Sequence, residues 1–378
     1  MGEKQKGKAE KWRRWMTAAG LAVSAAVLVW LLWYAQSQVD WGQLLTEIHP
    51  AWLLCAVLAI PALEVVDMLI FYSMGRRSGE NVHLDRCFDA TFIGELYYRL
   101  GLPGAPMQLG LLLDAGFSPT AAAGVYTWKS LAHTGAYALF ALAALGCKLG
   151  LWGERLGWLL PPILLTLAGY GALCALGLWA VKRPDKTAAL VRRFFAFWTK
   201  KLRWLQRDRR GERAGEKGAE YCAALGRMGT NRELLWRVFL GVFVELLLLF
   251  SVPAYLYCGL GLRGASFLQV TLTTSLVMLL ARLVALPGNA VGAEGSFYLL
   301  LAPYFSGYTA VALLLWRLLT FAWPMLLGAA VSLFRAGARR FGKERGAAGL
   351  GQREVVTNDN DPFATRKNKE FFYHFPQK

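Results

Sequence analysis

The sequence predicts an all-α polytopic membrane protein with about six transmembrane helices and two re-entrant helical hairpins, arranged as an inverted repeat. Three observations support this fold class. Hydrophobic residues make up 56% of the 378 residues, and the mean hydropathy is +0.35. Several apolar runs exceed the roughly 20 residues that cross a bilayer as a helix. The two halves of the chain also carry similar features in the same order.

Six apolar segments are the candidate membrane spans. They cover residues 15–36, 51–74, 119–146, 157–181, 235–260 and 307–334. The first follows a basic start, but its apolar stretch is longer than that of a signal peptide and carries several tryptophans. We therefore expect an uncleaved first helix.

Basic residues separate the spans and set the expected topology. Lys and Arg gather in residues 1–14, 75–87 and 182–234 and in the tail from Arg335. Because an excess of Lys and Arg marks cytoplasmic loops, we expect a multi-pass protein of the cell (inner) membrane with both termini in the cytoplasm. The net charge of +17 thus indicates topology and contact with an anionic inner-leaflet surface rather than nucleic-acid binding.

The predicted organisation has five parts. They are the N-terminal basic segment with the first transmembrane helix (1–36), a first half (37–181), a basic cytoplasmic loop (182–234), an inverted second half (235–334) and a cytoplasmic, disordered tail (335–378). Within the loop, residues 186–210 have a helical period with an apolar and a basic side. This pattern predicts an interfacial amphipathic helix, with a solvated helical hairpin as the alternative.

Each half contains an apolar segment that is interrupted by Leu-Pro-Gly. The first predicted re-entrant hairpin (88–113) breaks at Pro103 and Gly104, and the second (266–305) at Pro287 and Gly288. The first arm of the first hairpin would be about 22 Å long, short of a hydrocarbon core of about 30 Å. The first arm of the second hairpin has 21 residues and could cross, but the basic tail would then end outside.

An internal repeat relates the two halves. Phe-Ser opens residues 117–129 and 305–317, and each segment ends with Trp followed by a cation. An arginine precedes each Leu-Pro-Gly, and the first helix of each half carries a glutamate. The matching residues are Arg99, Trp128, Lys129 and Glu64 in the first half, and Arg282, Trp316, Arg317 and Glu245 in the second. Since the two final helices enter from opposite faces, we expect Lys129 and Arg317 to lie at similar depth.

Ionisable residues inside apolar segments form the candidate site. An unpaired charge at that depth costs roughly 2.5–3.5 kcal/mol, so such residues are functional hypotheses. The predicted substrate-binding residues are Lys129, Arg317, Arg99, Arg282, Trp128 and Trp316, and the predicted orienting or titrating acids are Glu64, Asp67, Glu95, Glu245 and Glu294. The alternative is that these acids and bases only neutralise one another and hold the bundle together.

Neighbouring residues refine this site. Glu64 and Asp67 share a helix face, which suits clamping Arg99 or Lys129. His133, one turn after Lys129, is either a packed helix residue or a proton relay. The six cysteines and four histidines form no ligand pattern, so we expect no metal, no cofactor and no catalytic residue. No ATP-binding motif is present in the sequence.

The stretches "LGLPGAPMQLGLLLDAGFSPTAAA" and "LPGNAVGAEGSFYLLL…FSGYTAVALLLWR" resemble the lysylphosphatidylglycerol synthase transmembrane-region family, and the likeness covers about residues 10–335. The family includes the flippase half of the multiple-peptide-resistance-factor proteins. The resemblance implies an inverted-repeat lipid translocase fold that often dimerises. Only 44 residues follow Phe334, so we expect no soluble aminoacyl-transferring domain.

The function expected from these features is that of a flippase. Its substrate would be a phospholipid, such as an aminoacylated phosphatidylglycerol, or a lipid-linked anionic head group. One alternative is a phosphatidylglycerol lysyltransferase-type enzyme, or its membrane partner, in lipid modification and cationic-peptide resistance. A second is a non-transporting scaffold. The expected partners are membrane lipids, a second copy of the chain and a separate lipid-modifying enzyme.

Overall fold

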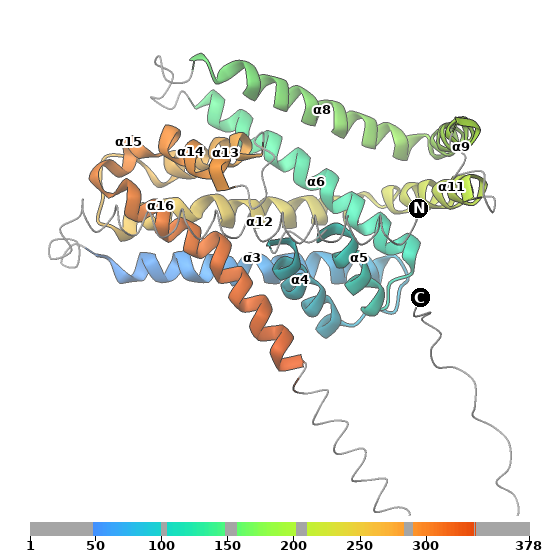
Figure 1. Ribbon diagram of the computed structural model, residues 1–378, viewed down its shortest axis with the longest axis horizontal. Helices are drawn as coiled ribbons and strands as arrows, with labels where there is room; N and C mark the ends of the chain where they lie inside the picture. Colours follow the sequence, from blue (N-terminus) through green and yellow to red (C-terminus); the bar gives the residue numbers. More distant parts are fainter. Residues whose placement is uncertain are drawn as a thin grey trace, which may run out of the picture. The chain divides into compact units, whose positions relative to one another are not determined.

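The computed structural model describes residues 48–99, 104–147, 157–201, 210–282, 290–335 and 337. Every regular element in these ranges is a helix, which confirms the all-α prediction (Figure 1). The chain forms two compact units, Met1–Ser332 and Leu333–Lys378, and the site described below belongs to the first. The predicted first span, the breaks at Pro103, Pro287 and Gly288, and nearly all of the predicted tail lie outside the described residues.

Four described helices are long and apolar enough to cross a membrane. They are α3 (Pro50–Arg77), α8 (Leu160–Lys182), α12 (Arg232–Gly259) and the helical stretch Ala302–Arg335. They match four of the predicted spans. The predicted span 119–146 forms α6 (Pro119–Gly146), which has 28 residues. It is not among these four helices, because Lys129, His133 and other polar residues lower its hydropathy.

Helix starts follow local capping rules. The Ser118 side chain accepts a hydrogen bond from the Ala121 N–H at 3.4 Å, and Pro119 occupies the first turn of α6. Asn231 caps α12 through the Leu234 N–H at 3.0 Å. Ser266 and Gln269 form a capping box at the start of α13 (Phe267–Ala281). Polar residues at these boundaries thus fix where the apolar helices begin.

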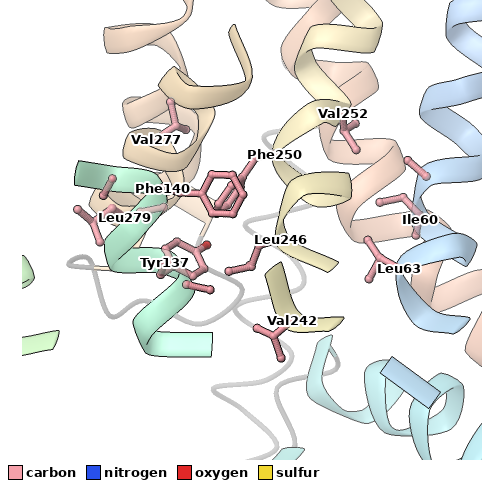
Figure 2. Packing of buried hydrophobic residues seen from close by; sticks show 14 of the residues in the cluster. Ile60, Leu63, Tyr137, Phe140, Val242, Leu246, Phe250, Val252, Val277 and Leu279 are labelled. Atoms are coloured by element: carbon pink, nitrogen blue, oxygen red, sulfur yellow. The ribbon is translucent and has the colours of Figure 1, made fainter. Parts of the chain in front are cut away.

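Helix α12 lies at the centre of the bundle. It packs along α3 on one side and against α6 and α13 on the other, as Figure 2 shows for the side chains around Leu246. The ring of Phe250 meets the rings of Tyr137 and Phe140 edge to face, with centroids 5.0 and 5.1 Å apart. Because lipid tails are as apolar as these side chains, close van der Waals packing stabilises such contacts more than burial does.

Two pairs of short helices lie at the sequence positions where re-entrant hairpins were predicted. Helix α4 (Leu84–Arg99) packs against α5 (Gly104–Asp114), and α13 packs against α14 (Ala290–Leu300). Of the 21-residue arm predicted for the second hairpin, residues 267–281 form α13, and the residues beyond Arg282 lie outside the described ranges. Neighbouring helices bury α13 nearly all round, so its uniform apolarity reflects a protein environment as much as a lipid one.

The predicted basic loop contains two helices that run along each other, α9 (Pro184–Lys201) and α11 (Arg210–Gly229). Helix α11 also packs on α6 and α8. Two hydrogen bonds join it to α6: one links Tyr221 to Thr127, and the Trp128 indole donates to the Leu225 carbonyl at 3.2 Å. The amphipathic helix predicted for 186–210 is described as far as Lys201.

The last described helices contain an irregular turn. α15 (Ala302–Phe305), η3 (Ser306–Tyr308) and α16 (Thr309–Arg317) lead into η4 (Leu318–Ala322), which is π-helical. Beyond it, Gly328 lies so close to α4 that an added Cβ would be 2.4 Å from the Phe92 carbonyl oxygen. Only glycine permits this approach between the two backbones.

Candidate functional site

A group of ionisable residues lines a cavity of about 440 Å³ among α3, α4, α6 and α12, which we call the first cavity. Its charged residues and its histidine are Glu64, Asp67, Glu95, Arg99, Lys129, His133, Glu245 and Arg282. Six of these seven charged residues were singled out by patterns in the sequence: five belong to the internal repeat, and Asp67 shares a helix face with Glu64. The structure thus brings together charges that come from five separate segments.

Lys129 and Asp67 form an ion pair inside this cavity, as expected for a cation clamped by the acidic face of α3. Their side chains are 13% and 6% exposed, and the ring of Phe71 lies 4.8 Å from the ammonium. Two charges withdrawn from water depend on each other, because removing one leaves the other uncompensated. Lys129 is therefore held in place by Asp67.

Glu64 and Glu245 also line the first cavity, and neither forms an ion pair with a described Lys or Arg. Glu64 is 2% exposed and forms no ion pair within the described part of the chain. Glu245 Oε1 lies 3.9 Å from His133 Nε2, and its Oε2 is buried without a hydrogen-bond partner among the described residues. Buried polar atoms of this kind are usually satisfied, so an unpaired one points to an additional ligand.

A second cavity of about 380 Å³ adjoins the first, and four residues line both: Tyr98, Arg99, Leu249 and Arg282. Trp316, Arg317 and Thr320 line only the second. Arg99 and Arg282 therefore lie at the boundary between the two cavities.

Arg317 has its own acidic partner in Glu294, with its Nε 2.6 Å from Oε1. The two side chains are largely buried. Trp316 is fully buried and packs on Phe297, with centroids 5.0 Å apart. Lys129 and Arg317 thus each pair with an acid and line adjoining cavities, and the common depth predicted for them stays a prediction.

Arg99 connects α4 to the irregular turn. Its guanidinium lies 2.9 Å from the Glu95 carboxylate and donates a hydrogen bond to the Thr320 carbonyl within η4. π-helical turns are rare and recur at functional sites, because they disturb the regular backbone hydrogen bonding. Arg282 has another environment, since its guanidinium lies over the Tyr137 ring, 4.0 Å from the centroid.

The remaining predicted residues lie elsewhere. Trp128 lines neither cavity: it is buried, its indole N–H is bonded to α11, and it faces a groove of about 420 Å³ with Leu131 and Trp236. Trp128 was predicted to bind substrate, but its described contacts are packing contacts and a hydrogen bond to α11. Gly104 begins α5, and the other break residues lie outside the described ranges.

Several polar lining residues were not predicted from the sequence: Tyr98, Gln108, Tyr126, Ser130, Thr134 and Thr320. The sequence contained a pattern that points to three of them. Tyr126, Ser130 and Thr134 are spaced so that they fall on the same face of α6 as Lys129 and His133. Neutral residues such as these are common in membrane helices, so their spacing becomes informative only beside the charged ones.

Comparisons with known proteins agree with the resemblance in the sequence. No curated protein matches the chain. A family model described as "Lysylphosphatidylglycerol synthase TM region" matches residues 18–328, a range that holds both cavities and all the ion pairs described above. The chain therefore belongs to the lysylphosphatidylglycerol synthase transmembrane-region family of multi-pass membrane proteins.

Proposed function

We propose that this chain is a lipid translocase that moves a phospholipid whose head group carries both a phosphate and an amine, such as an aminoacylated phosphatidylglycerol. The observation that carries the proposal is the first cavity, where carboxylates and guanidinium groups line one buried space in a protein of this family. A purely anionic head group would leave Glu64 and Glu245 without a role.

Arginines at the boundary of the two cavities suit the phosphate. Arg282 has no described carboxylate within ion-pairing distance, and its guanidinium rests on the Tyr137 ring. A guanidinium binds phosphate through two parallel N–H donors, which gives orientation as well as attraction. Arg99, which also faces both cavities, would follow the phosphate from one to the other, while Lys129 and Arg317 keep the acids beside them neutralised.

Carboxylates in the first cavity suit the amine. Glu64 is buried and Glu245 is largely buried, neither forms an ion pair with a described Lys or Arg, and the second oxygen of Glu245 has no described hydrogen-bond partner. An ammonium group between them would make charge-assisted hydrogen bonds in a poorly solvated space, where such bonds are strong. His133, close to Glu245, would fix the orientation of that carboxylate.

The proposal includes the membrane arrangement. We infer that the α4–α5 and α13–α14 pairs are re-entrant and related as an inverted repeat, with both termini in the cytoplasm. In support, α4 and α13 are only about 24 and 22 Å long, short of a hydrocarbon core of about 30 Å. Broken helices at an inverted-repeat interface form the substrate sites of many transporters.

A reconstitution assay tests the proposal. Purified protein in liposomes would be tested for movement of fluorescent lysylphosphatidylglycerol and of fluorescent phosphatidylglycerol. Arg282→Gln should stop both lipids, and Glu64→Gln/Glu245→Gln should slow the amine-bearing lipid more. Arg263→Gln, an exposed arginine outside both cavities, is the matched control. Wild-type rates for both lipids in the folded cavity variants would contradict the proposed site. No movement by wild type would favour the lipid-modification or scaffold alternative.

A further inference from the structure

We propose that the exposed apolar face of α9 binds the surface of an anionic membrane and holds the α9–α11 helix pair against it. This inference concerns a surface outside both cavities and does not depend on lipid transport. Four observations support the inference: the apolar composition of this face, the packing of α9 on α11, the position of α9 directly after a membrane span, and the arrangement of the charges on α9.

Large apolar side chains are exposed along one side of α9. Leu190, Phe194 and Trp198 follow one another at intervals of four residues, and they are 57%, 57% and 38% exposed. This spacing lines them up on one helix face. Clustered exposed apolar residues mark a site of protein or membrane interaction, whereas scattered ones do not.

The neighbouring face of α9, which packs on α11, limits which way these residues can point. Val191 and Phe195 face α11, where a Cβ added at Gly218 would be 2.7 Å from a Val191 methyl group. Helix α11 is in turn bonded to α6 through Tyr221 and Leu225. Because a glycine contact this close leaves little freedom to rotate, α9 cannot turn the Leu190–Phe194 stripe onto α11.

The position of α9 brings this face to a membrane surface. Only Arg183 separates α8, one of the four candidate spans, from the start of α9 at Pro184. In Figure 1, α8 runs across the view while α9 is seen nearly end-on, so α9 turns sharply away from the α8 axis. A helix that follows a membrane span at such an angle runs along the bilayer surface.

Charges on α9 specify the type of surface. At 3.6 residues per turn, Lys186 and Arg193 fall beside the Leu190–Phe194 stripe, whereas Arg192 falls on the far side of the helix. Basic residues that flank an apolar stripe can reach anionic head groups while the stripe enters the acyl boundary. A second copy of the chain fits less well, because it would bring the same basic face to a chain of net charge +17.

Fluorescence quenching of the full chain tests this surface. In a background where the six native cysteines are replaced, Phe194→Cys and the matched control Ala196→Cys would carry an environment-sensitive fluorophore. Both positions are exposed on α9, but Ala196 lies far from the apolar stripe. In liposomes containing phosphatidylglycerol, lipid-borne nitroxide should quench the label at 194, and aqueous iodide should quench the label at 196.

Charge variants complete the test. Arg193→Gln should weaken local membrane docking about fivefold, so that iodide quenches the label at position 194 more strongly. Arg192→Gln should change the quenching of this label little. Liposomes of phosphatidylcholine alone should mimic Arg193→Gln. Iodide access at 194 equal to that at 196 would overturn the proposal. Protection of position 194 from both quenchers would also overturn it, and would indicate a protein partner or a second copy.

Discussion

The ammonium of Lys129 on α6 forms an ion pair with the carboxylate of Asp67 on α3, and both side chains are largely withdrawn from the surface of the protein. This relationship changes how variants of Lys129 must be interpreted. Lys129→Met should destabilise the fold by about 3–5 kcal/mol, because it leaves a buried carboxylate without its partner. Lys129→Met/Asp67→Leu should recover most of that loss. Thermal unfolding in detergent would measure both.

Lys217→Met, at an exposed position of α11, is the control and should leave stability unchanged. A Lys129→Met protein as stable as wild type would contradict the ion pair. The double variant is therefore the proper background for asking whether the charge at position 129 matters for lipid movement.

The Arg317–Glu294 pair should behave as an independent unit. A double-mutant cycle of Arg317→Gln and Glu294→Gln should give a coupling energy of about 0.5–3 kcal/mol, because the two groups are in direct contact. Lys129→Met and Glu294→Gln share no partner and should add to within about 0.3–0.5 kcal/mol. Strong coupling across the cavities would show instead that all the charges form one network.

Gly328 should tolerate no side chain. Gly328→Ala would bring its Cβ to 2.4 Å from the Phe92 carbonyl oxygen and push α4 away from the helix that carries Thr320. Overpacking of this kind costs about 1–3 kcal/mol or more, and it should also separate Arg99 from its acceptor. Gly110→Ala in α5 has open space around the new Cβ, so it should be neutral or stabilising. Equal unfolding temperatures for the two variants would contradict the close approach.

Tyr221 should hold α11 on α6. Tyr221→Phe removes the hydrogen bond to Thr127 and should cost about 0.5–1.5 kcal/mol, seen as faster amide hydrogen exchange in α11. Tyr255→Phe, whose hydroxyl makes no hydrogen bond to a described residue, is the control. Unchanged exchange in α11 would mean that apolar packing alone fixes the helix.

The same tyrosine should make α11 sensitive to alkaline pH. Burial raises the pKa of the Tyr221 phenol above its usual value of 10.0, although the bond to Thr127 acts in the opposite direction. A raised pKa in the folded state favours the neutral phenol, so its contribution is complete below pH 10 and is lost as the pH rises above it. Exchange in α11 should therefore rise above pH 10 in wild type more than in Tyr221→Phe.

Much of the fold could be predicted from the sequence because apolar run length and charge distribution are local properties. Four predicted spans match the four membrane-length helices, and the Leu-Pro-Gly segments lie between short helices. The spacing of Glu64 and Asp67 indicated an acidic helix face that suits a cation, but it left open whether Arg99 or Lys129 would meet it. The surroundings of α13 could not be predicted, because a helix buried in protein and one buried in lipid are equally apolar.

The sequence by itself determined the helices, the family and the set of buried charges. Only the tertiary structure decided which acid on one helix meets which base on another: Asp67 with Lys129, and Glu294 with Arg317. It also decided that Arg99 donates to a backbone carbonyl of η4. The reason is physical. Hydropathy and helical period act over a few turns of one helix, whereas an ion pair within about 4 Å depends on how helices distant in sequence pack together.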